Sequence, residues 1–109
     1  MAYDYKQDPI LKKIQTAIVK AVAPNKIVLF GSRARGDVSD KSDYDILVIK
    51  DQVKNEREIT RRINYELLNQ AIDRDVDVIA ASTETWNRNI DNIAFVYRRI
   101  NSEGIVLYE

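Results

Sequence analysis

Two aspartates, Asp43 and Asp45, stand one residue apart at the start of an apolar run, DYDILVI. Alternate residues of a β-strand point to the same face, about 7 Å apart at Cα, so both carboxylates would project together. Aspartate is depleted in strands and is rarely buried unless it is paired or binds a metal. Such a pair can ligate Mg²⁺, and two ions can hold the attacking and leaving oxygens of a phosphoryl transfer. The alternative is structural: Asp43 ends a turn and Asp45 pairs with a distant arginine.

A later run, RDVDVIA, carries two more alternating aspartates, Asp75 and Asp77. If this strand lies beside the strand of Asp45, one of the two completes a site of three carboxylates. Asp77 has apolar neighbours on both sides, whereas Asp75 follows Arg74 at the entry to the strand, and we therefore favour Asp77. Because the chain has no histidine, the acid nearest the nucleophile is also the candidate general base.

The segment GSRARG, directly after the apolar run KIVLF, contains two of the three glycines of the chain. Gly31 permits a tight turn, and Ser32 and the following amides can begin a short helix whose free N–H groups bind an anion. Arg33 and Arg35 can add bidentate contacts to phosphate oxygens. The alternative is a helix cap followed by two solvated arginines.

Periodicity predicts the elements that must position these residues. Amphipathic helices are expected at 8–22, 55–72 and 82–100, and apolar or alternating strands at 26–30, 43–49, 75–81 and 104–109. The first helix is expected to open with Asp8 as its cap and Pro9 in its first turn. Strands and helices alternate along the chain, which indicates one α/β (α+β) domain over residues 1–109 with a mixed β-sheet flanked by helices.

The composition excludes several classes of function. Lys plus Arg and Asp plus Glu both number 17, so no overall basic field favours general nucleic-acid binding. The lack of cysteine and histidine excludes thiol chemistry, Cys/His zinc sites and imidazole catalysis. No apolar run approaches the roughly 20 residues of a membrane helix, and the N-terminus has no apolar signal region, so we expect a cytoplasmic protein without membrane contact.

The segment GSRARGDVSDKSDYDILV resembles the signature of nucleotidyltransferases of the DNA polymerase β superfamily: a Gly-Ser pair, an Arg-Gly turn, an Asp-x-Asp entering an apolar strand, and a further Asp on a later strand. The resemblance implies the polymerase-β-like palm fold. It implies that Gly31 and Ser32 hold the β and γ phosphates of ATP, with Arg33 and Arg35 beside them. Asp43 and Asp45 would ligate two Mg²⁺ ions, and Asp77 the ion that activates the acceptor hydroxyl.

Within that superfamily, the small chain and its end, VYRRINSEGIVLYE, resemble the minimal nucleotidyltransferases. These are typically encoded beside a HEPN-domain ribonuclease, and the pair acts as a toxin and antitoxin. The resemblance implies transfer of AMP from ATP to a tyrosine of that partner, in a hetero-oligomer, with a homodimer as the alternative for the chain alone.

A hypothesis of another class is a non-catalytic antitoxin that inhibits its partner by covering it. Three converging carboxylates argue against it, because a pure binding module does not need them. Trp86 is expected to pack at a helix start rather than to stack on a base. The paired arginines at 61–62 and 98–99 are expected on solvated helix faces or a protein interface.

Overall fold

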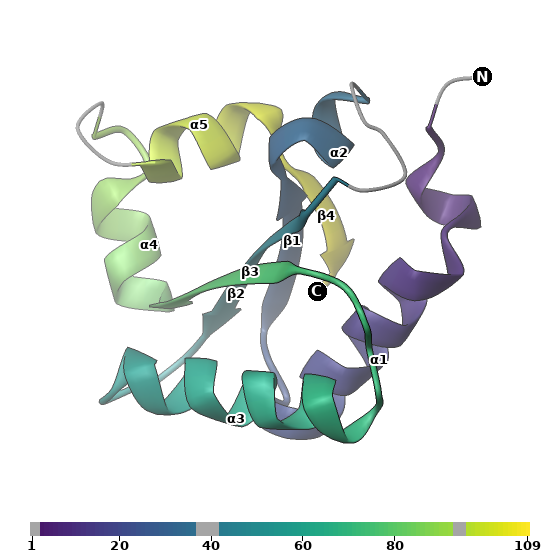
Figure 1. Cartoon of the computed structure of the whole chain (residues 1–109). Helices are drawn as coiled ribbons and strands as arrows, with labels where there is room; N and C mark the ends of the chain where they lie inside the picture. Colours follow the sequence, from purple (N-terminus) through teal and green to yellow (C-terminus); the bar gives the residue numbers. More distant parts are fainter. Residues whose placement is uncertain (1–2, 37–41, 93–95) are drawn as a thin grey trace.

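Four strands form one mixed sheet in the order β3-β2-β1-β4, covered by helices (Figure 1). The structure, a computed structural model, describes residues 3–36, 42–92 and 96–109. The strands are β1 (Lys26–Phe30), β2 (Tyr44–Lys50), β3 (Val76–Ser82) and β4 (Ile105–Tyr108). The helices are a 3₁₀ turn η1 (Tyr5–Gln7), α1 (Pro9–Val22), α2 (Gly31–Arg35), α3 (Glu56–Asn69), α4 (Thr83–Asn89) and α5 (Val96–Glu103).

The sheet combines antiparallel and parallel pairs. β1 runs antiparallel to both β2 and β4, and β3 runs parallel to β2 after the crossover through α3. The predicted mixed sheet flanked by helices is confirmed, and the predicted strands at 43–49 and 75–81 are neighbours. Consequently the end of β1 and the beginnings of β2 and β3 meet at one end of the sheet.

One face of the sheet is covered by α1, at the lower right of Figure 1, and by α3, along the bottom. Helix α1 begins with Asp8 as N-cap and Pro9 in its first turn, as predicted, because the carboxylate accepts from free amides and proline needs no donor there. Its apolar stripe, including Ile14 and Ile18, is fully buried against β2 residues such as Ile46. This packing supplies the larger core.

The opposite face is covered by α4 and α5, at the left and top of Figure 1. Alternate sheet residues such as Leu47 and Ala81 pack there against Trp86 of α4 and Ile100 of α5. Trp86 is 9% exposed and its ring meets that of Tyr97 edge to face at 5.7 Å between centroids. The predicted packing role of Trp86 is confirmed.

The prediction of one helix over 82–100 is wrong. Helix α4 ends at Asn89, Ile90–Asn92 are not helical, and α5 begins at Val96; Ile93 and Ala94, which the prediction included, lie outside the described residues. The amide of Asn92 donates to the carbonyl of Asn89 in a turn, as expected of Asn and Asp, which favour turns. The break lets both Trp86 and Ile100 reach the same core.

Other differences are confined to element ends. Helix α3 stops at Asn69, three residues before the predicted end, and Ala71 has a φ of 56° that no helix accommodates. Over residues 3–36, 42–92 and 96–109, none of the helices has the length and apolar character that crossing a membrane requires.

Candidate active site

Asp45 of β2 and Asp77 of β3 are direct neighbours in the parallel strand pair. Both lie on the sheet face that α4 and α5 cover, because they alternate with Tyr44 and Val78, which pack on the other face. Phe30, the last residue of β1, pairs with Asp45 from the other side. The carboxylates therefore stand where β1 ends and β2 and β3 begin.

Electrostatics at this position disfavour the ionised form of Asp45. Burial raises its pKa above the usual value, and the negative charges of Asp77 and Asp43 raise it further. The positive charge of Arg35 acts in the opposite direction, and a side-chain hydrogen bond with Asp77 also raises the pKa. The carboxylates are thus close enough to repel one another, and a cation placed among them would be attracted.

The strand register distinguishes the two aspartates of the third strand. Asp77 is opposite Asp45, whereas Asp75 precedes the strand and its backbone carbonyl accepts from the amide of Tyr44 at 3.0 Å. Asp43 directly precedes β2 and is exposed. In the part of the chain that the structure describes, no three acidic side chains are already arranged to hold a metal ion. The site of three carboxylates therefore stays a prediction, and the pair that the fold brings together is Asp45 and Asp77.

Gly31 opens α2 immediately beside Asp45. Its φ is 75°, a conformation that side chains rarely adopt, and a Cβ atom there would lie 2.2 Å from Oδ2 of Asp45. Gly36 ends the helix with a φ of 87°. The predicted short helix after the first strand is confirmed, and Phe30 at its N-cap position has no side-chain acceptor for the first amides. The first amides of α2 therefore lie next to the carboxylate of Asp45. Residues 37–41, which belong to the segment GSRARGDVSDKSDYDILV, lie outside the described residues.

The two arginines of α2 occupy different environments. Arg33 is 5% exposed, and its Nε and Nη2 donate to the backbone carbonyl of Ser42 at 3.2 and 2.8 Å. Arg35 is exposed, and its Nη1 lies 3.7 Å from a carboxylate oxygen of Glu103. The burial of Arg33 argues against its predicted phosphate contact, because its guanidinium already binds protein groups. Arg35 can still face a phosphate, and its contact stays a prediction, as does that of Ser32, which is half-buried.

Sequence reasoning did not single out Tyr44 and assigned Asp8 only a capping role. Tyr44 is 1% exposed and its hydroxyl donates to Oδ2 of Asp8 at 2.8 Å. The available signal was the position of Tyr44 between the two site aspartates, in a strand that alternates faces.

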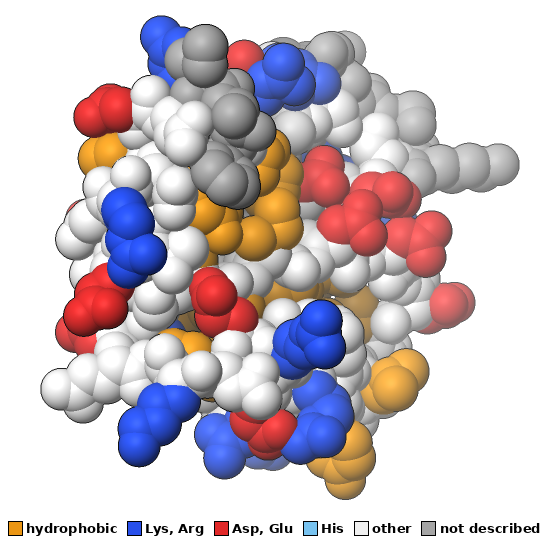
Figure 2. Space-filling view, turned by 90° about the vertical axis from the view of Figure 1, so that its left-hand side faces the viewer, with side chains coloured by type: hydrophobic (Ala, Val, Ile, Leu, Met, Phe, Trp, Pro, Cys, Tyr) orange, Lys and Arg blue, Asp and Glu red, His pale blue; other side chains and the backbone are white. Residues whose placement is uncertain are grey.

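Charged side chains are unevenly spread over the surface. Figure 2, which looks onto the α4 side, shows a group of acidic side chains at the upper right and Lys and Arg side chains gathered along the lower edge, at the level of α3. On α3, Arg61 and Arg62 are exposed and both pair with Glu58, the latter at 3.6 Å. Their place on a solvated helix face agrees with the expectation from the sequence.

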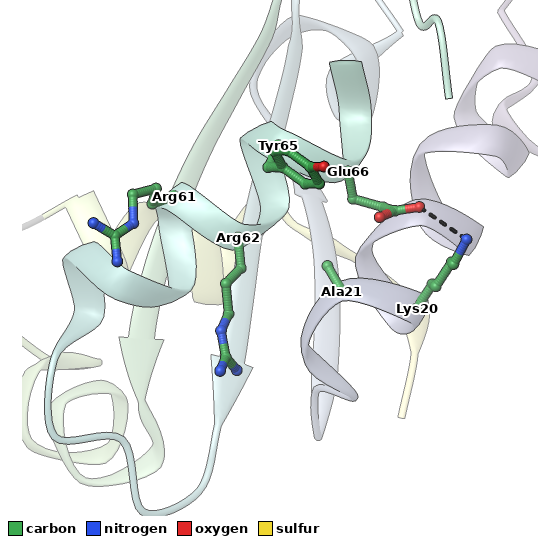
Figure 3. Close-up of a pocket in the computed structure, with 6 residues that line it drawn as sticks. All are labelled: Lys20, Ala21, Arg61, Arg62, Tyr65 and Glu66. Atoms are coloured by element: carbon green, nitrogen blue, oxygen red, sulfur yellow. Dashed lines mark ion pairs between the residues drawn. The ribbon is translucent and has the colours of Figure 1, made fainter. Parts of the chain in front are cut away.

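A shallow pocket of about 400 Å³ lies between α1 and α3, on the sheet face opposite the carboxylates (Figure 3). Arg61, Arg62 and Tyr65 of α3 line it, together with Lys20 and Glu66, which form an ion pair at 3.3 Å. Because Lys20 pairs with Glu66 and both arginines pair with Glu58, the positive charges of this pocket are partly neutralised by protein carboxylates.

Comparison with known proteins identifies the family. Residues 12–109 match the family model described as "Polymerase beta, Nucleotidyltransferase". The chain belongs to this nucleotidyltransferase family. The predicted superfamily is thereby confirmed, and the chain is a nucleotidyltransferase.

A protein of Methanocaldococcus jannaschii, named "Putative protein adenylyltransferase", is 39% identical over 83 residues, which cover 76% of this chain and 77% of that protein. A crystal structure described as a "putative nucleotidyltransferase" from Sulfolobus solfataricus superposes with a TM-score of 0.63 at 22% identity, covering 92% of this chain and 78% of that one. The structural likeness bears on the fold alone, and it agrees with the predicted fold.

Proposed function

We propose that this protein transfers AMP from ATP to a tyrosine of a HEPN-domain ribonuclease and so acts as its antitoxin. The observation that carries the proposal is the pairing of Asp45 with Asp77 beside Gly31, at the start of α2. The name of the M. jannaschii relative, a protein adenylyltransferase, supports a protein acceptor rather than a small molecule. The HEPN partner rests on the resemblance to minimal nucleotidyltransferases.

The proposed reaction has one bond formed and one broken. The oxygen of the acceptor tyrosine attacks the α-phosphorus of ATP, the bond from the α-phosphorus to the bridging oxygen breaks, and pyrophosphate leaves. The proton of the tyrosine hydroxyl passes to whichever carboxylate of the Asp45–Asp77 pair lies nearest to the acceptor, which serves as the general base because the chain has no histidine. Gly31 lets the backbone of α2 approach, and Ser32 and Arg35 hold the β and γ phosphates.

The site fits Mg²⁺. Asp43, Asp45 and Asp77 offer only hard oxygen ligands, and the repulsion that raises the pKa of Asp45 would be relieved by a cation. These three residues would hold two ions. When bound, Mg²⁺ neutralises phosphate charge and makes the acceptor hydroxyl more acidic.

The test is transfer of label from ATP labelled at the α-phosphate to the HEPN protein encoded beside this chain. We expect mass spectrometry to find one or more AMP increments on a tyrosine of the partner, together with loss of its ribonuclease activity. Asp45→Asn and Asp77→Asn should abolish both, and Asp75→Asn is the matched control that should retain them.

Inhibition of the partner by Asp45→Asn without attached AMP would replace this proposal with the non-catalytic antitoxin. If the label appears on a small molecule or an RNA instead of the partner, the proposal of a protein acceptor is wrong. The assignment of nucleotidyltransferase activity would still hold.

A further inference from the structure

Four side chains meet on the sheet face opposite the candidate catalytic carboxylates, next to the N-terminus of α1. We call Tyr3, Asp8, Arg33 and Tyr44 the Asp8 cluster. Asp8 is 9%, Arg33 5% and Tyr44 1% exposed. The cluster connects η1 and α1 to both α2 and β2, which carry the candidate site.

Asp8 is the centre of the cluster. Its Oδ2 accepts from the hydroxyls of Tyr3 and Tyr44, each at 2.8 Å, and lies 3.6 Å from Nη1 of Arg33. Its Oδ1 accepts from the amides of Ile10 and Leu11 at 2.9 and 3.2 Å. One carboxylate therefore caps α1 and also binds side chains from α2 and β2.

Arg33 links the cluster to the segment that enters β2. While Nη1 faces Asp8, Nε and Nη2 both donate to the carbonyl of Ser42, and the guanidinium carbon lies 3.9 Å from the centre of the Tyr44 ring. Ser42 and Tyr44 are the residues on either side of Asp43. The same guanidinium thus restrains the chain before and after that aspartate.

Strand geometry transmits this restraint to the catalytic face. Successive side chains of a strand point to opposite faces, so a fixed Tyr44 ring sets the direction in which Asp45 projects. Arg33 also belongs to α2, whose first residue lies against Asp45. The Asp8 cluster therefore fixes the start of α2 relative to the start of β2, through contacts on the sheet face opposite Asp45.

Packing alone does not require such a cluster. Burying ions is costly, and replacing a buried ion pair by apolar residues of similar volume is often neutral or stabilising. A planar guanidinium with two parallel donors does, however, specify position and angle more narrowly than apolar packing does.

We propose that the Asp8 cluster positions Asp43 and Asp45 against α2 for nucleotidyl transfer, with Arg33 as the central positioning residue. The predicted effect on kcat rests on the proposed function. The predicted restraint of residues 42–46 by Arg33 does not. Arg33 acts through Ser42 and Tyr44 and does not touch the nucleotide.

Two variants and one control test the proposal in the full chain. Arg33→Lys keeps the charge but loses the paired donors to Ser42, and Tyr44→Phe removes only the hydroxyl that binds Asp8. The control, Asn55→Ala, removes the side-chain cap of α3, which accepts from the amide of Arg57 at 3.0 Å and is not part of the cluster. Each is assayed at a temperature at which it is fully folded, for kcat and KM of AMP transfer and for hydrogen exchange.

We expect Arg33→Lys to lower kcat by about tenfold to a hundredfold with a smaller effect on KM for ATP, because small misplacements of reacting groups carry penalties of that order. Tyr44→Phe should have a smaller effect in the same direction, and Asn55→Ala should leave kcat unchanged. Hydrogen exchange should accelerate at residues 42–46 in Arg33→Lys and not in the control.

An equal loss of kcat in Arg33→Lys and Asn55→Ala, or unchanged exchange at residues 42–46 in Arg33→Lys, would overturn the positioning role. If the wild-type protein transfers no AMP, the proposed function fails by itself. The exchange result then still decides whether Arg33 restrains the entry to β2.

Discussion

A Cβ atom on Gly31 would lie 2.2 Å from Oδ2 of Asp45, well inside the contact distance of two atoms. The first residue of α2 therefore has no side chain because the carboxylate occupies that volume. A similar restriction does not apply at Gly36, where an added Cβ would meet nothing within 4 Å. The two glycines share a positive φ and differ in their neighbours, which makes them a matched pair.

Gly31→Ala should displace Asp45 and weaken binding of ATP with Mg²⁺ by about tenfold or more, equivalent to about 1.4 kcal/mol. Gly36→Ala should cost about 1 to 2 kcal/mol of unfolding free energy through its backbone alone and should affect ATP binding less. Calorimetric titration and thermal melting measure the two effects. Equal losses of ATP affinity in both variants would contradict a specific contact between Gly31 and Asp45.

Asp45→Asn should leave the melting temperature unchanged or raise it, because it removes one of the charges that repel each other at Asp45 and Asp77. The same variant should lose binding of ATP in Mg²⁺. Asp75→Asn, one pleat away from the pair, is the control and should bind ATP normally. Unfolding of Asp45→Asn would instead assign this aspartate to a structural ion pair.

ATP should bind far more weakly in EDTA than in Mg²⁺. Without a cation, the phosphates would approach the carboxylates of Asp43, Asp45 and Asp77, and like charges repel one another. Isothermal titration in both buffers checks this directly. Equal affinities would exclude a metal-dependent mode of ATP binding at these carboxylates.

The ionisation of Asp8 should make the free energy of unfolding depend on pH. Burial opposes ionisation of its carboxyl, but hydrogen bonds from Tyr44, Tyr3 and the amides of Leu11 and Ile10 outweigh it and lower its pKa. A lowered folded-state pKa contributes stability that is present above the unfolded value of 3.8 and is lost as pH falls through the folded value.

Asp8→Asn should therefore cost about 1.5 to 3 kcal/mol of unfolding free energy at pH 7, the range for hydrogen bonds to charged groups. Denaturant titrations of both proteins between neutral and acidic pH measure this difference. It should shrink as the wild-type carboxylate becomes protonated, and a difference that does not change with pH would contradict a stabilising charge on Asp8.

The sequence by itself determined most of the elements and indicated the candidate site residues, because both rest on local patterns. Alternation along DYDILVI predicts Asp43 and Asp45 on one strand face, although β2 begins at Tyr44 and Asp43 directly precedes it. A glycine directly after a buried strand indicates a tight turn. Helix stripes and the Asp8 cap are equally local signals. For these features, the spacing of residues along the chain is enough to predict which way their side chains point.

The tertiary structure alone decided the features that depend on residues far apart in the chain. The register that sets Asp77 opposite Asp45 follows from how β3 docks on β2, across more than 30 intervening residues. Arg33 and Arg35 look equivalent in GSRARG, yet one is buried against Asp8 and the other is exposed. The apolar period of 82–100 continues through the break between α4 and α5, and the shared core for Trp86 and Ile100 that the break permits forms only in the folded sheet. Strand register and ion pairing join residues that are far apart in the chain, and the spacing of residues within one segment does not determine which distant residue becomes the partner.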